Sequence, residues 1–129
     1  MADCVLDSSA ILSWIGGEQG HEAIEPHLAD AACSANIVAE VVAKLADWGW
    51  SAPAIERALI ELAFDVHPVA ENDAVQIGLL HAPTRAAGLS LGDRSCLALA
   101  ARLALPAITM DRAWANVADA VGVEVRVLR

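Results

Sequence analysis

Lysine is almost missing from this 129-residue chain, and Lys44 is the only one. Eight basic residues stand against 17 acidic ones, which gives a net charge of −9. This balance excludes a protein that holds nucleic acid only by neutralising phosphates with its own side chains. It favours a protein that binds cations or pairs with a basic partner. A nucleic-acid substrate would need metal ions at the contact.

Long apolar runs are also missing, although 57% of the residues are hydrophobic. Stretches such as 95–101 stop at a charge, here Arg102, well short of the roughly 20 apolar residues that span a bilayer. The first residues lack the pattern of a signal peptide. Cys4, Cys33 and Cys96 are widely spaced in apolar segments, which predicts buried thiols and neither a disulfide framework nor a zinc site. We therefore expect a cytoplasmic protein that has no contact with a membrane.

Several catalytic motifs are missing as well. The chain contains no phosphate-binding glycine loop and no pair of histidines at metal-ligand spacing. The four tryptophans are expected in the core or in an interface, and not as platforms for stacking bases.

Strand and helix patterns alternate along the whole chain. We expect strands at 2–6, 32–35, 64–69, 106–110 and 123–128, and helices at 8–14, 21–29, 36–48, 51–62, 71–87, 92–104 and 112–121. Ser8 or Ser9 is expected to cap the first helix, Asn36 the third, and Pro83 should kink the helix after residue 71. This alternation predicts one α/β domain over residues 1–129, with a mainly parallel sheet covered on both faces.

Two aspartates follow buried strands directly. Asp7 comes after Cys4–Leu6, and Asp111 comes after Ile108–Met110. Ligands of an open parallel sheet bind outside the carboxyl ends of its strands. Either aspartate alone would be read as an ordinary turn residue. Both at the same edge of one sheet favour a binding or catalytic site.

Glu40 and Asp93 lie on predicted helices, and each has a structural alternative. Glu40 stands four residues before Lys44, and an ordinary ion pair between them would be worth about 0.2–0.5 kcal/mol. Asp93 heads the apolar face of its helix, where an unpaired charge is costly to bury. A helix N-cap and a metal ligand explain Asp93 equally well. The residues alone leave these alternatives open.

Four segments taken together resemble the PIN-domain family, and within it the VapC-type toxins of bacterial toxin–antitoxin pairs. They are VLDSSA at 5–10, AEV at 39–41, GLSLGDRSCLALA at 88–100 and TMDRAW at 109–114, in the family's order and spacing over nearly the whole chain. The resemblance implies a three-layer α/β/α sandwich that gathers four acids at one edge of the sheet, and the matching positions are Asp7, Glu40, Asp93 and Asp111.

The resemblance also implies supporting residues. Ser8 and Thr109 match hydroxyl residues beside the site, and Arg112 follows the fourth acid as is usual in the family. Arg85, Arg94 and Arg112 are the only candidates for phosphate contacts near the site. None of the four acidic positions is replaced, so the resemblance predicts an active enzyme.

The activity implied is that of an endoribonuclease that cleaves RNA with Mg²⁺, for which Mn²⁺ can substitute, bound by the four carboxylates. Hard divalent cations prefer oxygen ligands, and they relieve the repulsion among clustered carboxylates. The expected products carry a 5′-phosphate and a 3′-hydroxyl, because a metal-bound water is the nucleophile. The family also implies a homodimer and a cognate antitoxin whose basic side chain occupies the site.

Two kinds of rival function remain. The first is a non-catalytic PIN-like module that serves in binding or as a scaffold. The second is another Mg²⁺-dependent α/β enzyme, and it fits poorly. Ser9 stands where a haloacid-dehalogenase-type phosphatase has its second aspartate, and Lys44 falls on an early helix instead of the late strand of a receiver domain.

Overall fold

A five-stranded sheet in the order β3-β2-β1-β4-β5 forms the centre of the molecule in a computed structural model that describes residues 1–129. The strands are β1 (Cys4–Leu6), β2 (Ala31–Ser34), β3 (Asp65–His67), β4 (Ala107–Thr109) and β5 (Val125–Val127). Every neighbouring pair is parallel. All five predicted strands are confirmed, with bounds that differ by a residue or two, and the sheet is wholly parallel.

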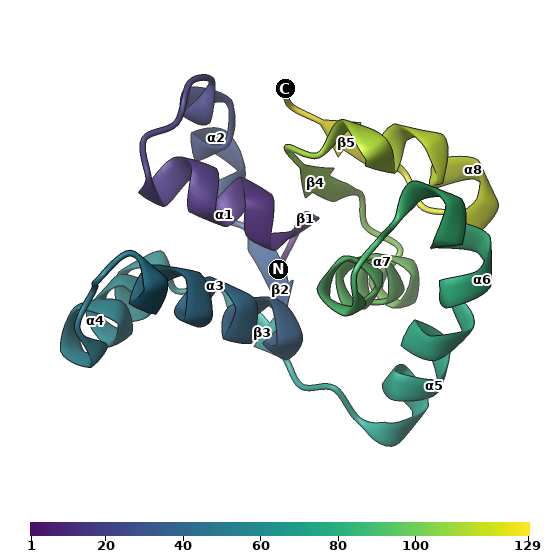
Figure 1. The fold of residues 1–129 in the computed structure, drawn as a ribbon, viewed down its shortest axis with the longest axis horizontal. Helices are drawn as coiled ribbons and strands as arrows, with labels where there is room; N and C mark the ends of the chain where they lie inside the picture. The colour runs from purple at the N-terminus through teal and green to yellow at the C-terminus, as the bar shows by residue number, and fades with distance from the viewer.

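Helices cover this sheet on both sides (Figure 1). The first half of the chain supplies one side, with α1 (Ser8–Ile15), α2 (Glu25–Leu28), α3 (Ala35–Asp47) and α4 (Ala52–Leu62). The second half supplies the other, with α5 (Glu71–Leu79), α6 (His81–Thr84), α7 (Leu91–Leu103) and α8 (Ala118–Val121). The 3₁₀ helices η1 (His21–Ala23), η2 (Arg85–Ala87) and η3 (Arg112–Asn116) complete the connections. The predicted three-layer α/β/α architecture is confirmed.

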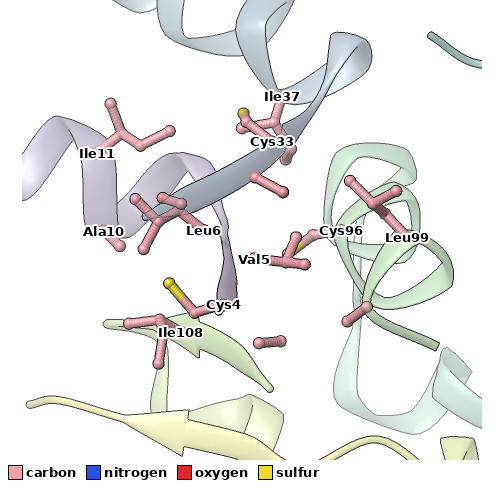
Figure 2. Close-up of a cluster of buried hydrophobic side chains, with 14 of the residues drawn as sticks. Cys4, Val5, Leu6, Ala10, Ile11, Cys33, Ile37, Cys96, Leu99 and Ile108 are labelled. Carbon is pink, nitrogen blue, oxygen red and sulfur yellow. The ribbon is translucent and has the colours of Figure 1, made fainter. Parts of the chain in front are cut away.

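One hydrophobic core of 24 buried residues lies between these layers. Strand β1 is buried along its whole length, and side chains from α1, β2, α3, α7 and β4 surround it (Figure 2). Cys4, Cys33 and Cys96 are all buried and free, as predicted. Trp114 is fully buried, whereas Trp48 and Trp50 are exposed at the end of α3. None of the helices combines the length and apolar character needed to cross a lipid bilayer.

Two predicted helix caps are wrong, for the same physical reason. Asp7 caps α1, and its carboxylate accepts a hydrogen bond from the Ala10 N–H at 2.9 Å. Ser34 caps α3, and its hydroxyl accepts from the Asn36 N–H at 3.3 Å. In both cases the helix begins directly after the strand. The cap is therefore the first residue beyond the strand or its last one, and not a polar residue one or two positions later.

The long helical pattern after residue 71 is interrupted, where the sequence predicted only a kink. Helix α5 ends at Leu79, and α6 begins at His81, with Leu80 between them as the C-cap of α5. Pro83 has no N–H with which to bond the Leu79 carbonyl, so the continuous helix fails one turn before the proline. The predicted helices at 21–29 and 112–121 are likewise each divided into a 3₁₀ turn and a short α-helix.

Candidate functional site

The order of the strands reverses beside β1, because β2 and β3 lie on one side of it and β4 and β5 on the other. Such a reversal opens a crevice at the carboxyl ends of the two strands that flank it. Asp7 follows β1, and Asp111 follows the end of β4 by two residues. The prediction that these two aspartates leave the same edge of the sheet is confirmed.

Asp7 is buried, with only 1% of its surface exposed. Its Oδ1 accepts from the Ala10 N–H at 2.9 Å, and its Oδ2 accepts from the Thr109 hydroxyl at 2.8 Å. The Ser9 hydroxyl lies 2.8 and 2.9 Å from the two oxygens. Burial raises the pKa of Asp7 to about 6; these hydrogen bonds oppose the rise, and the nearby charge of Asp93 adds to it. Asp7 is thus a firmly oriented carboxylate that ionises near neutral pH.

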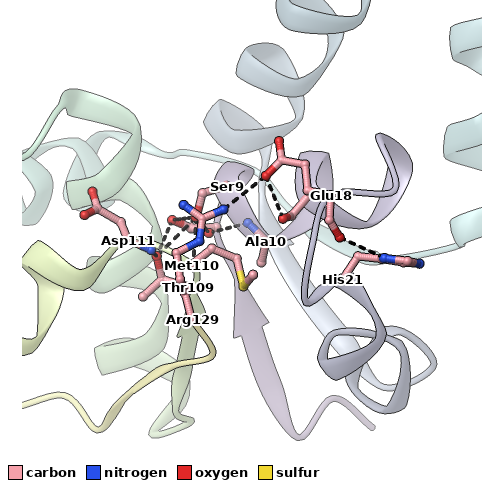
Figure 3. A network of polar contacts seen from close by, with 10 residues as sticks. Ser9, Ala10, Glu18, His21, Thr109, Met110, Asp111 and Arg129 are labelled. Atoms are coloured by element: carbon pink, nitrogen blue, oxygen red, sulfur yellow. Dashed lines mark hydrogen bonds and ion pairs between the residues drawn. The ribbon is translucent and has the colours of Figure 1, made fainter.

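Two backbone groups orient the hydroxyls that serve Asp7. The Met110 N–H donates to Ser9 Oγ at 3.0 Å, and the Asp111 N–H donates to Thr109 Oγ1 at 3.0 Å (Figure 3). These bonds occupy acceptor positions on both hydroxyls, so the hydroxyl hydrogens remain for Asp7. Sequence reasoning considered Ser9 as a helix cap and as a departure from the phosphatase pattern, and not as a residue of the site. Its place two residues after a strand-ending aspartate was the signal that it faces the same site.

Glu40 lies on α3 and accepts from the Ser8 hydroxyl at 2.8 Å. No ion pair joins it to Lys44, so the structural alternative for Glu40 does not hold. Its carboxylate lies against Gly92 in the first turn of α7, where any Cβ would collide with it. Gly92 therefore makes the room that Glu40 occupies. A glycine inside a helix is unfavourable, and that was the available signal.

Asp93 is the third residue of α7 and forms a capping box with Ser90. The Asp93 Oδ2 accepts from the Ser90 N–H at 2.9 Å, and the Ser90 hydroxyl accepts from the Asp93 N–H at 3.1 Å. Ser90, and not Asp93, is thus the N-cap. The capping interaction uses one carboxylate oxygen, so the other has no hydrogen bond within the protein.

Asp111 is exposed and caps η3, where its Oδ1 accepts from the Ala113 N–H at 3.0 Å. Figure 3 shows its side chain directed away from the bonds around Ser9 and Thr109. Glu40 links the regions of two other predicted acids, because it contacts Ser8, next to Asp7, and Gly92, next to Asp93. Asp111 lies apart from these three on the surface. No three carboxylates, histidines or cysteines converge closely enough in this arrangement to hold one metal ion together.

The donor set nevertheless fits a hard divalent cation. None of the four acids forms an ion pair with a basic side chain, whereas Asp73 on α5 pairs with Arg102. Glu40, Asp93 and Asp111 each keep a carboxylate oxygen without a hydrogen bond from the protein. Uncompensated carboxylate oxygens are the ligands that Mg²⁺ and Mn²⁺ prefer.

The three candidate phosphate contacts occupy different places. The Arg94 Nη1 donates to the Ile77 carbonyl at 3.2 Å, and its Nε is buried without a partner, so Arg94 joins α7 to α5 and does not face the site. Arg85 is exposed in η2. Arg112 lines a cleft together with Ser9, whose hydroxyl bonds to Asp7, and Asp111.

Known proteins resemble this chain both in sequence family and in fold. The PIN domain family model matches residues 4–120. A toxin–antitoxin complex from Klebsiella pneumoniae superposes with a TM-score of 0.74 at 19% identity, covering 98% of both chains. FitAcB from Neisseria gonorrhoeae gives 0.71 at 20% identity and 97% of both chains. VapC20 from Mycobacterium tuberculosis, a sarcin-ricin loop cleaving toxin, gives 0.72 at 16% identity over 88% of this chain and 93% of that one. No curated protein matches the sequence.

Proposed function

Because the chain belongs to the PIN-domain family, we propose that it is a metal-dependent endoribonuclease and the toxin of a type II toxin–antitoxin system. The observation that carries this proposal is the buried Asp7 where the strand order reverses, together with the lack of any ion pair between a basic side chain and Asp7, Glu40, Asp93 or Asp111. A carboxylate kept buried beside other acids is unfavourable for folding alone, which points to a role in binding a cation.

Each acid has a proposed task. Asp7 and Asp93 would be direct metal ligands, while Glu40 and Asp111 would hold a second ion or orient the attacking water. When bound, Mg²⁺ or Mn²⁺ lowers the pKa of a water ligand and neutralises charge on the scissile phosphate. Ser9 and Thr109 fix both oxygens of Asp7, and Ser8 fixes one oxygen of Glu40. Hydrolysis by such a water leaves a 5′-phosphate and a 3′-hydroxyl.

The proposed partners are supported by the acidic side chains of the site and by the similar solved structures. Complexes of toxin with antitoxin are prominent among the similar structures. We expect an antitoxin that inserts a basic side chain among the acids, since opposite charges guide such an association. A homodimer is proposed as well. The three free, buried thiols fit the reducing cytoplasm, where cellular RNA is available.

The test is cleavage of a pool of structured cellular RNAs by purified, antitoxin-free protein with Mg²⁺, with Mn²⁺ and with chelator. Asp7→Asn and Asp93→Asn are compared with Asp119→Asn, which makes the same change at an exposed aspartate of α8. We expect discrete, metal-dependent cuts from the wild type and from the Asp119 variant only. Removal of either active-site carboxylate should lower the rate by at least about 100-fold.

Each other outcome has a definite meaning. A folded wild type that cuts nothing with either metal would favour the non-catalytic binding module. Equal cleavage by all variants would indicate a contaminating nuclease and would remove the support for the site. Products that end in a 2′,3′-cyclic phosphate would rule out water as the nucleophile.

A further inference from the structure

A cleft beside the carboxylates carries positive charge in a protein that has little of it. Its lining consists of Ser9, Met110, Asp111, Arg112 and Arg129. The Ser9 hydroxyl contacts both oxygens of Asp7, so one side chain links the cleft to the buried carboxylate. Two of the eight basic residues of a chain with net charge −9 thus line one cleft, together with Asp111 and next to the Ser9 that bonds to Asp7.

Arg129 is held at this cleft by the backbone. The Leu128 N–H donates to the Thr109 carbonyl at 2.9 Å, which continues the pairing of β5 with β4 beyond the last residue of β5. Arg129 comes next in the chain. It therefore lies alongside the residues that follow β4, among them Asp111. The position of this arginine depends on the register of the sheet and not on a loop.

The guanidinium of Arg129 is oriented but remains accessible. Its Nη2 donates to Glu18 Oε2 at 3.1 Å, and the same oxygen accepts from the Ser13 hydroxyl at 3.1 Å (Figure 3). Both side chains of the ion pair are 48% exposed. One contact leaves most of the five N–H donors of an arginine free. Exposed ion pairs are weak, so a phosphate that accepts two parallel hydrogen bonds competes well. Arg112 forms no ion pair within the chain.

We propose that Arg129, together with Arg112, binds a phosphodiester group of the RNA backbone next to the one that is cleaved. Glu18 holds the guanidinium of Arg129 in the free protein and competes with the phosphate for it. The proposal rests on the proposed ribonuclease function. The two arginines would give the ribonuclease a positively charged surface for RNA, although the net charge of the protein is negative. Arginine suits the task because its planar group matches the geometry of a phosphate.

The experiment measures binding of a fluorescently labelled, mixed-sequence, single-stranded RNA in chelator, where no cleavage occurs, over a series of KCl concentrations. Three full-length variants are compared with the wild type. Arg129→Gln removes the proposed contact. Glu18→Gln breaks the same ion pair but leaves the arginine. Arg126→Gln is the matched control, because Arg126 is a half-exposed arginine of β5 that also pairs with a glutamate, Glu124, but lies outside the cleft.

We expect Arg129→Gln to weaken binding about threefold to tenfold and to reduce the slope of log Kd against log salt by about 0.7, the value for one phosphate contact with a single strand. In the metal-dependent cleavage assay the same variant should raise KM and leave kcat within about twofold. Glu18→Gln should bind RNA at least as well as the wild type, because it frees the arginine and removes a negative charge. Arg126→Gln should keep the slope of the wild type.

Three results would overturn the inference. Equal weakening by Glu18→Gln and Arg129→Gln would mean that the ion pair acts only on local structure. An unchanged slope in Arg129→Gln, with metal-dependent cleavage intact in the wild type, would reject the phosphate contact and leave the ribonuclease function standing. A wild type that neither binds nor cleaves RNA would reject both.

Discussion

At the scale of single residues, Asp7 combines almost complete burial with an ionisable side chain. Three donors, from Ser9, Ala10 and Thr109, reduce the cost of its charge but do not remove it, and burial still raises the pKa of Asp7 to about 6. A carboxyl group whose pKa is raised on folding holds its proton more tightly in the folded protein than in the unfolded chain. Its contribution to stability is therefore full at low pH and is lost as the pH rises.

Asp7→Asn should consequently stabilise the protein at neutral pH in the presence of chelator. Between about pH 4 and pH 6, the free energy of unfolding of the wild type should fall relative to that of the variant, by up to about 3 kcal/mol. Urea denaturation of both proteins at several pH values measures the difference. Asp119→Asn serves as the control, and its difference from the wild type should stay near zero. A difference between Asp7→Asn and the wild type that does not depend on pH would contradict the proposed cost of ionising Asp7.

At the scale of elements, the approach of α3 to the first turn of α7 determines where Glu40 can lie. The Glu40 carboxylate fills the space above Gly92 and reaches Ser8 at the start of α1. Three helices from separate parts of the sequence thus meet at one side chain. The obstacle to a larger residue at position 92 is the end of a flexible side chain and not backbone. A substitution there should move Glu40 without preventing folding.

Gly92→Ala should therefore lose activity and keep its stability. Alanine gains about 1 kcal/mol of helix propensity over glycine, which offsets part of the disturbance around Glu40. Displacement of a group in the site should lower kcat/KM by about tenfold to 100-fold. Gly78→Ala is the matched control, because Gly78 lies inside α5 and nothing stands within 4 Å of an added Cβ.

The control variant should gain about 1 kcal/mol in thermal or urea denaturation and cleave RNA at the rate of the wild type. If Gly92→Ala cleaves RNA as fast as Gly78→Ala, the position of Glu40 is irrelevant to the reaction.

At the scale of the whole molecule, acidic side chains outnumber the basic ones that could pair with them. The net charge is −9, yet the five ion pairs of the protein leave all four acids of the site unpaired. Salt of any kind screens the general repulsion. A bound divalent cation would act at these four carboxylates only, so the two effects are separable by experiment.

We expect Mg²⁺ at about 100 times its Kd to stabilise the wild type by about 3 kcal/mol, an increase of several degrees in Tm. KCl at equal ionic strength should give a smaller shift. The double variant Asp7→Asn/Asp93→Asn should respond to MgCl₂ and KCl alike, because only screening remains. Scanning calorimetry in the two salts provides the measurement. A Mg²⁺-specific shift that survives in the double variant would place the cation elsewhere.

The local pattern of apolar and polar residues along the chain was enough to predict most of the fold. Short apolar runs that alternate with segments of helical periodicity predicted all five strands and a mainly parallel sheet. This works because the hydrophobic pattern of a segment reflects which of its side chains are buried. Asp7 and Asp111 were placed at the correct edge because each follows such a run. Helix caps were harder to predict, because several neighbouring polar residues can accept from the same N–H groups. The cap of α1 is Asp7, directly after β1, and the cap of α3 is Ser34, the last residue of β2.

Tertiary structure alone decided the partners of the side chains. Glu40 bonds to Ser8, 32 residues away, and not to Lys44 one turn along its own helix. Arg94 turns to the Ile77 carbonyl, and Arg129 reaches the cleft through the pairing of β5 with β4. No local pattern contains these contacts, because they depend on strand order, sheet register and the space left by residues such as Gly92. The sequence by itself determined which residues carry charge and which segments are buried. Only packing decided which charges meet.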